Sequence, residues 1–464
     1  MSTWRHELGV QARLALPVVA IQLGLVAMGV VDSMFLGRVS AEAFAATTLG
    51  NSWSFQWLAL GFGILHALDP IASQAFGARD DDAIARGLQR GVVLALVLSP
   101  LLAVPVLFAE PFFVWLGQPP EVVPDASAYA RIATLGFPGF LVFVAARTVL
   151  QAMHRLAPLL WVIFWTNLLN VALDWMLIYG NLGFPPMGAV GSAWGTTVAR
   201  TVMGLAILVV ARPQLGRYLR PWRADTLRLE PILRMVRLGL PVGLQFTTEI
   251  GAFGLVGYLM GRFGAREIAG HQVAMTLVST SFMVPLGISI AASVRVGNEI
   301  GRGAADGARL AARVALCAGA LVMLVSATSF VVFPEPLTRL FTDQEDVLPI
   351  ALALLPLAAA FQVFDGVQVV GGGVLRGAAD TRIPFLAHVT GLWLVGMPLG
   401  AWLAFERGVG PAGLWWGLAL GLAIASVVLL WRVRWRLGQD LSRWESATPG
   451  GAEEAPEESP RERG

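Results

Sequence analysis

Twelve long apolar stretches, separated by short polar segments, fill almost the whole chain and decide what it can fold into. Stretches of about 20 apolar residues cross a bilayer as helices, because a helix satisfies its own backbone hydrogen bonds in lipid. The predicted spans are 10–35, 46–70, 88–109, 128–150, 157–179, 188–211, 234–260, 270–294, 308–333, 348–373, 384–405 and 412–434. Only 14% of the 464 residues are charged. The sequence therefore predicts an all-α membrane protein with twelve transmembrane helices.

The chain also repeats itself at an offset of 224 residues. Matching positions include Arg13 and Arg237, Pro17 and Pro241, Gly37-Arg38 and Gly261-Arg262, Gly63 and Gly287, and Gly77 and Gly301. Each repeat holds six spans, so both halves enter the membrane in the same orientation. This pattern predicts two six-helix lobes related by a pseudo-two-fold axis along the membrane normal.

The repeat also sets the expected domain boundaries. They are an N-terminal lobe at 1–211, a cytoplasmic arginine-rich linker at 212–233, a C-terminal lobe at 234–437 and a tail at 438–464. The tail is polar, proline-rich and acidic, a composition typical of disordered segments. Most arginines fall in segments on one side of the predicted spans, which places both termini in the cytoplasm by the positive-inside rule. Arg147 and Arg295 lie near inner helix ends, where we expect them to reach the lipid headgroups.

A few ionisable and amide side chains lie inside the predicted spans. They are Asp32, Asn170 and Asp174 in the N-terminal half, and Glu249 and Asp365 in the C-terminal half. An aspartate at mid-bilayer costs about 2.5–3.5 kcal/mol, so such a group usually faces a partner or a cavity. Each acid is either a structural group bonded to a neighbouring helix or part of a site. Carboxylate and amide oxygens suit Na⁺, and a carboxylate in an apolar setting can hold a proton.

Local sequence around these acids adds two hypotheses. Pro17, fifteen residues before Asp32, is expected to act as a hinge in the first span. Several apolar side chains near the acids are candidates to contact a flat ligand, the alternative being plain packing. These side chains are Phe246, Phe253, Phe282, Met283, Phe361 and Phe364.

Three motifs resemble those of the multidrug and toxic compound extrusion (MATE) family, and most closely its bacterial NorM-type branch. They are VDSMFLGR around Asp32, NLLNVALD ending at Asp174, and DGVQVVGGGVLRGAADTRIP beginning at Asp365. The resemblance covers roughly residues 8–437. In that family two six-helix lobes form a V, and cationic amphiphilic drugs leave the cell in exchange for Na⁺ or H⁺.

The resemblance implies a role for particular residues of this chain. The N-lobe cation or proton site of the family maps onto Asp32, Asn170 and Asp174, and a threonine that helps line it falls near Ser192. The C-lobe acids map onto Glu249 and Asp365. NorM-type members can carry a tyrosine one turn before the second of these acids. Phe361 stands there in this chain, so one hydroxyl ligand for Na⁺ is missing.

These observations favour a secondary active multidrug efflux antiporter over two alternatives. An intramembrane enzyme would need a motif such as HExxH or GxSxG, and the sequence contains neither. A lipid-linked oligosaccharide flippase of a related fold remains the alternative, and it would be expected to line its cavity with arginines that hold pyrophosphate.

The hypothesis carries further expectations about ions, partners and location. We expect no cofactor beyond a coupling ion, H⁺ and/or Na⁺, with Na⁺ at Asp32, Asn170 and Asp174. The expected partners are small cationic amphiphilic drugs or dyes and the lipid bilayer, and not nucleic acid. The expected location is the bacterial inner membrane, as a monomer.

Overall fold

The computed structural model describes residues 4–342 and 344–443, and its regular elements in that part of the chain are all helices. The first half contains α1 (Trp4–Leu36), α2 (Ala41–Leu65), α3 (Leu68–Gly77), α4 (Asp81–Val106), α5 (Ala109–Trp115), α6 (Val123–Thr134), α7 (Phe137–Ala152), α8 (Ala157–Leu177), η1 (Asn181–Gly183) and α9 (Gly188–Val210). The short elements α10 (Arg212–Leu219) and η2 (Ala224–Leu227) follow. The second half contains α11 (Leu229–Met260), α12 (Ala265–Gly301), α13 (Ala305–Val332), α14 (Pro334–Arg339), α15 (Leu348–Gly377), α16 (Arg382–His388), η3 (Val389–Gly396), α17 (Met397–Ala401), η4 (Trp402–Glu406) and α18 (Pro411–Gly438). The predicted disordered tail, 438–464, lies outside the described residues from 444 onward.

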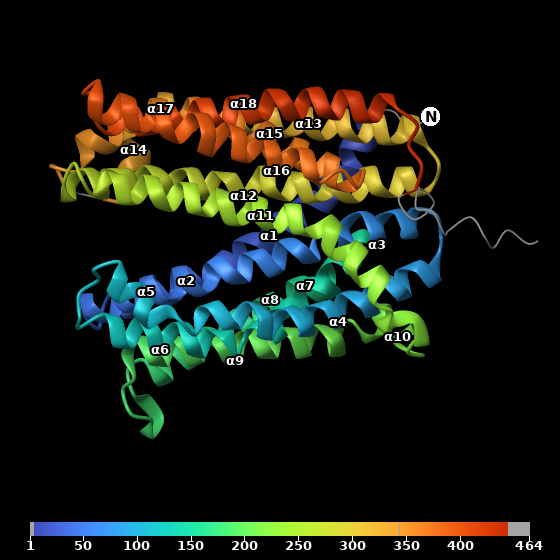
Figure 1. Cartoon of the computed structure of the whole chain (residues 1–464), viewed down its shortest axis with the longest axis horizontal. Helices are drawn as coiled ribbons and strands as arrows, with labels where there is room; N and C mark the ends of the chain where they lie inside the picture. The colour runs from blue at the N-terminus through green and yellow to red at the C-terminus, as the bar shows by residue number, and fades with distance from the viewer. Residues whose placement is uncertain (1–3, 343, 444–464) are drawn as a thin grey trace, which may run out of the picture.

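The helices form two bundles that lie side by side, as Figure 1 shows, with α2 to α9 in one and α11 to α18 in the other. Within the described residues, ten helical stretches are long and apolar enough to cross a membrane, and the pair α6 and α7, bent by 47°, adds an eleventh. The remaining predicted span is α11, which is 32 residues long but more polar, because it contains Gln245, Thr247, Thr248 and Glu249. The all-α membrane fold with two six-helix lobes is confirmed.

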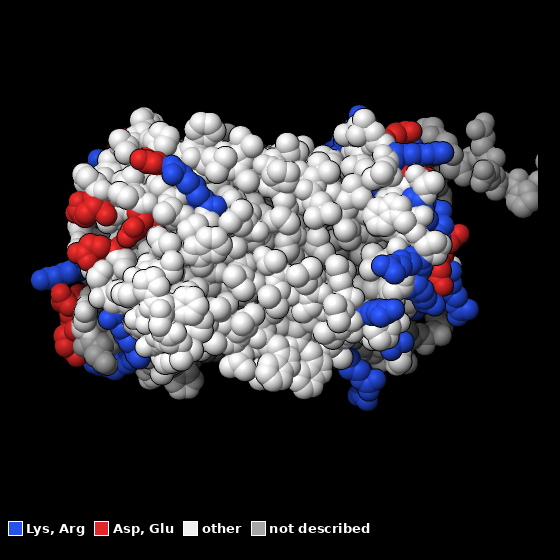
Figure 2. All heavy atoms as spheres, turned by 90° about the horizontal axis from the view of Figure 1, so that it is seen from below, with Lys and Arg blue, Asp and Glu red and all other residues white. Residues whose placement is uncertain are grey.

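One end of the molecule carries most of the basic side chains. In Figure 2 blue side chains gather at the end that lies on the right in Figure 1, acidic ones gather at the opposite end, and the band between is almost free of charge. We call the first of these the arginine-rich end. Helix α3 ends there, and α10 lies there (Figure 1).

Contacts between the lobes join residues that are equivalent in the sequence repeat. A Cβ placed on Gly77 of α3 would lie 2.0 Å from the backbone oxygen of Asn298, and a Cβ on Gly301 of α12 would lie 2.0 Å from the backbone oxygen of Gln74. The two contacts are related by the offset of 224 in both partners. Equivalent residues therefore exchange the same contact across the pseudo-two-fold axis, as an isologous interface requires.

Two further glycine contacts repeat in the same way. Gly63 of α2 meets the backbone of Gly243 in α11, and the equivalent Gly287 of α12 meets Val19 of α1. Ser73 and Gly297, which are equivalent to each other, also meet: a Cβ on Gly297 would lie 1.9 Å from the Ser73 hydroxyl oxygen. Small residues let membrane helices approach until their backbones touch, which increases dispersion contact. The glycines of the repeat thus define the seam between the lobes.

A buried ion pair joins the lobes at the arginine-rich end. Arg295 of α12 donates from Nε and Nη2 to the two carboxylate oxygens of Glu7 in α1, at 2.9 and 2.7 Å, and also donates to Glu299 at 2.8 Å. Arg295 is only 7% exposed. The expectation that this side chain reaches the headgroups is therefore wrong, because a bidentate carboxylate partner is available inside the protein.

We expect Gly77→Ala and Gly301→Ala to destabilise the protein, because each added methyl group would collide with a backbone carbonyl of the opposite lobe. Overpacking of this kind typically costs about 1–3 kcal/mol. Thermal unfolding of the purified protein in detergent measures the effect. Gly372→Ala is the matched control, since a Cβ at Gly372 in α15 meets nothing within 4 Å. Equal unfolding temperatures for Gly77→Ala and Gly372→Ala would contradict the proposed seam.

Candidate ion-binding sites of the two lobes

Polar residues from three helices meet inside the N-terminal lobe. Asp32 lies in α1, Asn170 and Asp174 lie one turn apart in α8, and Ser192 lies in α9. Asp32 is 5% exposed, and the other three side chains are fully buried. The carboxyl groups of Asp32 and Asp174 interact electrostatically. The structure thus brings Asp32 and Asp174 together, with Asn170 one turn before Asp174 in α8 and Ser192 one turn before Thr196 in α9.

Few of the oxygen atoms in this cluster have a hydrogen-bond partner. Thr196 donates to Asp32 Oδ2 at 2.7 Å. No partner among the described residues reaches Asp32 Oδ1, either carboxylate oxygen of Asp174, the side-chain oxygen of Asn170 or the hydroxyl of Ser192. Buried polar atoms are normally hydrogen-bonded, because leaving them unpaired costs free energy. A small cation or a proton at this cluster would satisfy them.

The chemistry of these donors limits which ion fits. They are two carboxylates, one amide and one hydroxyl, all of them hard oxygen ligands of the kind that alkali and alkaline-earth ions prefer. In the described part of the chain, no group of three or more His, Cys, Asp or Glu side chains is placed to hold a metal ion. The arrangement therefore fits Na⁺ or H⁺ better than a transition metal.

A glycine of α9 makes room for the buried carboxylate. A Cβ placed on Gly195 would lie 2.6 Å from Asp174 Oδ1. Thr196, the next residue, follows Ser192 by one helical turn, so its hydroxyl lies on the same face. Sequence reasoning singled out Ser192 alone, although this spacing indicated Thr196 as well. Tyr129 and Arg200, which interact electrostatically with Asp32, were also missed.

The C-terminal lobe also brings its two predicted acids together. Asp365 in α15 is 3% exposed, and Glu249 in α11 interacts electrostatically with it. Gln368, one turn after Asp365, donates from Nε2 to Asp365 Oδ1 at 2.9 Å. Gln368 also interacts with Glu249, so its amide links both acids.

A buried histidine extends this C-lobe cluster. Nε2 of His388 lies 2.6 Å from Gln368 Oε1, and Nδ1 of His388 lies 2.7 Å from the backbone oxygen of Pro384. His388 is fully buried and is the last residue of α16, directly before the π-helical segment η3. Segments of π-helix often occur at functional sites. A lone histidine in an apolar span carries no spacing signal that ties it to Asp365, so the sequence did not identify it.

The remaining predicted residues occupy less polar surroundings. Helix α1 continues through Pro17 without a break in this conformation. Phe361 is fully buried against Phe253 and Trp415, with ring centroids 6.0 and 5.9 Å away. Phe246 stacks on Phe62 of the opposite lobe at 5.5 Å. Phe282 and Met283 of α12 are partly buried, and Phe364 is 37% exposed.

A third group of charged side chains lies where the lobes meet. Oδ2 of Asp69 in α3 lies 2.8 Å from Nδ1 of His66 and 3.8 Å from Nε of Arg376, which belongs to α15 in the other lobe. Arg147 is fully buried, stacks over Phe62 and donates to Gln22 at 3.2 Å. The expectation that Arg147 reaches the headgroups is therefore wrong. The predicted second span ended at residue 70, whereas α2 ends at Leu65 and a separate helix, α3, runs from Leu68 to Gly77.

We expect Gly195→Ala to displace the Asp174 carboxylate and to lower thermal stability by about 1–3 kcal/mol, as overpacking does. Thermal unfolding of the purified protein is the measurement. Gly254→Ala is the control, since a Cβ there meets nothing within 4 Å. Asp174→Ala in the Gly195→Ala background should remove the clash, so the two changes should be strongly non-additive. Additive effects would show that the methyl group and the carboxylate do not collide.

Comparisons with known proteins agree with this architecture. The profile of the MatE family matches residues 17–176 and 241–402, one segment in each lobe. The chain is 36% identical over 446 residues to "Probable multidrug resistance protein NorM" of Pseudomonas putida, covering 94% of this chain and 96% of that protein. It is 33% identical over 440 residues to "Multidrug resistance protein MdtK" of Edwardsiella ictaluri, covering 93% and 96%.

A solved structure shares the fold as well. The eukaryotic MATE transporter AtDTX14 superposes with a TM-score of 0.84 at 21% identity, covering 93% of this chain and 96% of that one. The family profile matches segments in both lobes, and the identity to the Pseudomonas putida protein is 36% over nearly the whole length. Together these two findings establish the family. The chain belongs to the MatE family, and it is a multi-pass membrane transporter and not an enzyme.

Proposed function

We propose that this protein is a secondary active multidrug efflux antiporter that exports cationic amphiphilic compounds in exchange for H⁺ and/or Na⁺. Relatives that match over most of the chain are named multidrug resistance proteins. Buried acids in both lobes supply negative charge that a cationic drug and a coupling ion would compete for. The single observation that carries the coupling mechanism is the hydrogen-bonded chain of Asp365, Gln368 and His388.

From the donors and acceptors along this chain we infer that it takes up a proton. The backbone oxygen of Pro384 only accepts, so Nδ1 of His388 carries the N–H of a neutral ring. Nε2 then presents a lone pair, which lies 3.4 Å from the amide nitrogen of Gln245, a donor, and 2.6 Å from Gln368 Oε1, a second acceptor. Two acceptors at this distance repel each other. The chain is therefore complete only when it holds one more proton.

That proton has two places to reside. It is either on Nε2 of His388, with Asp365 ionised, or on Asp365, with the amide of Gln368 turned so that its NH₂ group faces the histidine. Rotation of one buried amide would thus pass the charge from one end of the chain to the other. Glu249, beside Gln368, adds a second carboxylate whose repulsion favours keeping a proton in the cluster.

The N-lobe cluster has a different composition, which suits Na⁺. Asp32, Asp174, Asn170 and Ser192 offer oxygen atoms that lack donors, and backbone carbonyls can complete a coordination shell. Bound Na⁺ would neutralise the two carboxylates. We infer that protons drive transport through the C-lobe, and that Na⁺ is optional and acts mainly at the N-lobe.

Transport then follows from competition during alternating access. An ion that enters from outside neutralises the acids and so favours release of the cationic drug. Return to the opposite conformation releases the ion to the cytoplasm and restores the negative charge. Pro17 in α1 is the proposed hinge for this change, because proline removes a backbone hydrogen bond within the helix.

The flippase alternative predicts a different distribution of charge. A pyrophosphate-linked substrate would need arginines free to bind it. Arg376 lies beside Asp69 and donates to Ser289 at 3.0 Å, and Arg147 packs on Phe62. These two arginines thus already have protein partners, whereas Asp32 and Asp174 keep oxygen atoms without a hydrogen-bond donor among the described residues, which favours cationic substrates. We place the protein in the bacterial inner membrane as a monomer, with both termini and the arginine-rich linker at 212–233 in the cytoplasm.

We expect Asp365→Asn to abolish efflux of a cationic dye from cells while the protein still reaches the membrane. Asp32→Asn and Asp174→Asn should each strongly reduce efflux, because each removes a negative charge for which the coupling ion and the drug compete. Dye accumulation and membrane expression are measured together. Asp306→Asn is the control, since that side chain is exposed and pairs with Arg309. Full drug resistance with Asp365→Asn would refute the C-lobe proposal, and wild-type rates with both N-lobe variants would refute the N-lobe site.

The coupling ion is tested with purified protein in sealed vesicles, a fluorescent cationic dye and one gradient at a time. A pH gradient without Na⁺ should drive dye movement, and His388→Phe should reduce it to background because both ring nitrogens are lost. A Na⁺ gradient at constant pH should give weaker movement that Asp174→Asn removes. Movement under the Na⁺ gradient alone, with none under the pH gradient, would overturn the assignment of protons to the C-lobe.

A further inference from the structure

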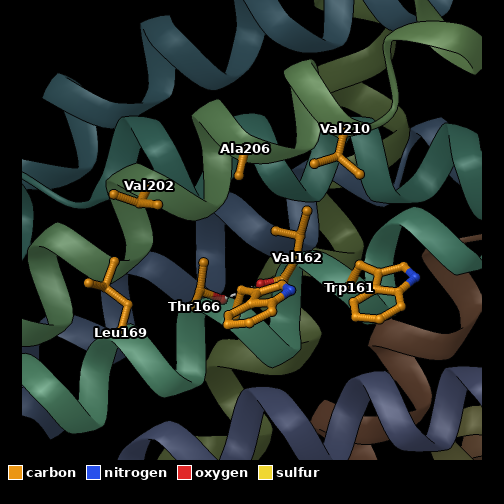
Figure 3. Close-up of a pocket in the computed structure, with 8 residues that line it drawn as sticks. Trp161, Val162, Thr166, Leu169, Val202, Ala206 and Val210 are labelled. Atoms are coloured by element: carbon orange, nitrogen blue, oxygen red, sulfur yellow. Dashed lines mark hydrogen bonds between the residues drawn. The ribbon is translucent and has the colours of Figure 1, made fainter.

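An apolar groove lies on the outer surface of the N-terminal lobe, between α8 and α9. It has a volume of about 250 Å³. Its lining residues are Trp161, Val162, Trp165, Thr166, Leu169, Val202, Ala206 and Val210. Figure 3 shows that Trp161 and Val210 lie at one end and that Leu169 and Val202 lie at the other. Eight residues separate Trp161 from Leu169, so the groove runs along the helices for about 12 Å.

The sizes of the side chains explain the hollow. Ala206 and Thr166 are small and lie at the middle of the groove, between larger neighbours (Figure 3). Thr166 donates its hydroxyl hydrogen to the backbone oxygen of Val162 at 2.7 Å, so it offers no free donor to an occupant. Trp161 and Trp165 remain 59% and 57% exposed beside the groove. The lining of the groove is therefore apolar, and its two tryptophans are exposed on the outside of the lobe.

Two exposed arginines flank one end of this groove. Arg155 lies two residues before α8 begins, and Arg212 lies two residues after α9 ends, so both lie at the end marked by Trp161 and Val210. Both side chains are exposed, and neither has an ion-pair partner among the described residues. Arg217, in contrast, lies 3.6 Å from Asp81. The apolar groove thus ends beside two positive charges and a tryptophan.

We propose that this groove binds one acyl chain of an anionic phospholipid, whose phosphate lies between Arg155 and Arg212. Basic side chains at the ends of membrane helices bind anionic headgroups, and tryptophan favours the level of the headgroups. The lining is apolar along the groove and two positive charges flank one of its ends, which matches an acyl chain joined to an anionic headgroup. The site lies on the outside of the lobe, away from the acids, and does not depend on the proposed transport function.

Native mass spectrometry of the delipidated protein tests the proposal. The probes are phosphatidylglycerol and phosphatidylcholine with identical acyl chains. We expect the protein to bind one phosphatidylglycerol molecule tightly and to bind phosphatidylcholine with lower affinity. The double variant Arg155→Gln/Arg212→Gln should lower the affinity for phosphatidylglycerol roughly thirtyfold, as about 1 kcal/mol per arginine implies. Its control is Arg13→Gln/Arg434→Gln, which removes two exposed arginines elsewhere.

A second pair of variants tests the groove itself. Ala206→Trp should fill it and weaken both lipids, while Leu205→Trp, at a neighbouring position that is 61% exposed and outside the lining, should not. Equal affinity of the wild-type protein for the two lipids would overturn the proposal. An equal loss of phosphatidylglycerol affinity in Arg155→Gln/Arg212→Gln and in its control double variant would overturn it as well. A dimer that dissociates with Ala206→Trp would assign the groove to a second copy of the chain instead.

Discussion

Backbone contact between the two lobes is the constraint on which the rest of the structure depends. Equivalent glycines of α3 and α12, Gly77 and Gly301, let each helix end touch the carbonyls of the other lobe. Without a side chain between them, the backbones approach closely enough for dispersion to hold the lobes together in an apolar solvent. The same approach brings Glu7 against Arg295 and Asp69 near Arg376, so charge is buried only where an opposite charge faces it.

The two lobes share a fold but satisfy their buried polar groups differently. In the N-terminal lobe, Asp174 and Asn170 keep oxygen atoms without donors, so the site is completed only by something that binds. In the C-terminal lobe, Gln368 connects Asp365 to His388, and we propose that this chain takes up a proton. The proposed assignment of Na⁺ to the first site and of a proton to the second follows from this difference. A duplicated fold can thus hold two different ion sites, because side chains change more easily than backbone packing.

Much of this architecture could be predicted before any coordinates were considered. Apolar stretches gave the spans, because a helix in lipid needs a fixed length of apolar residues. The repeat predicted the two lobes, and its glycines, such as Gly63 and Gly287, proved to be the points of contact. The cost of burying charge drew attention to Asp32, Asp174 and Asp365. These features depend on local composition or on periodicity, which a sequence displays directly.

What the sequence by itself determined, then, is the number and length of the helices, their duplication and the buried acids. Only the tertiary structure decided which polar group each acid meets. His388 is 20 residues from Gln368 along the chain, and Thr196 is 164 residues from Asp32, yet both pairs are hydrogen-bonded. Arg147 and Arg295 were expected at the headgroups and are buried instead. Such pairings depend on which helix faces lie together, and hydropathy and spacing carry no information about that because they describe one helix at a time.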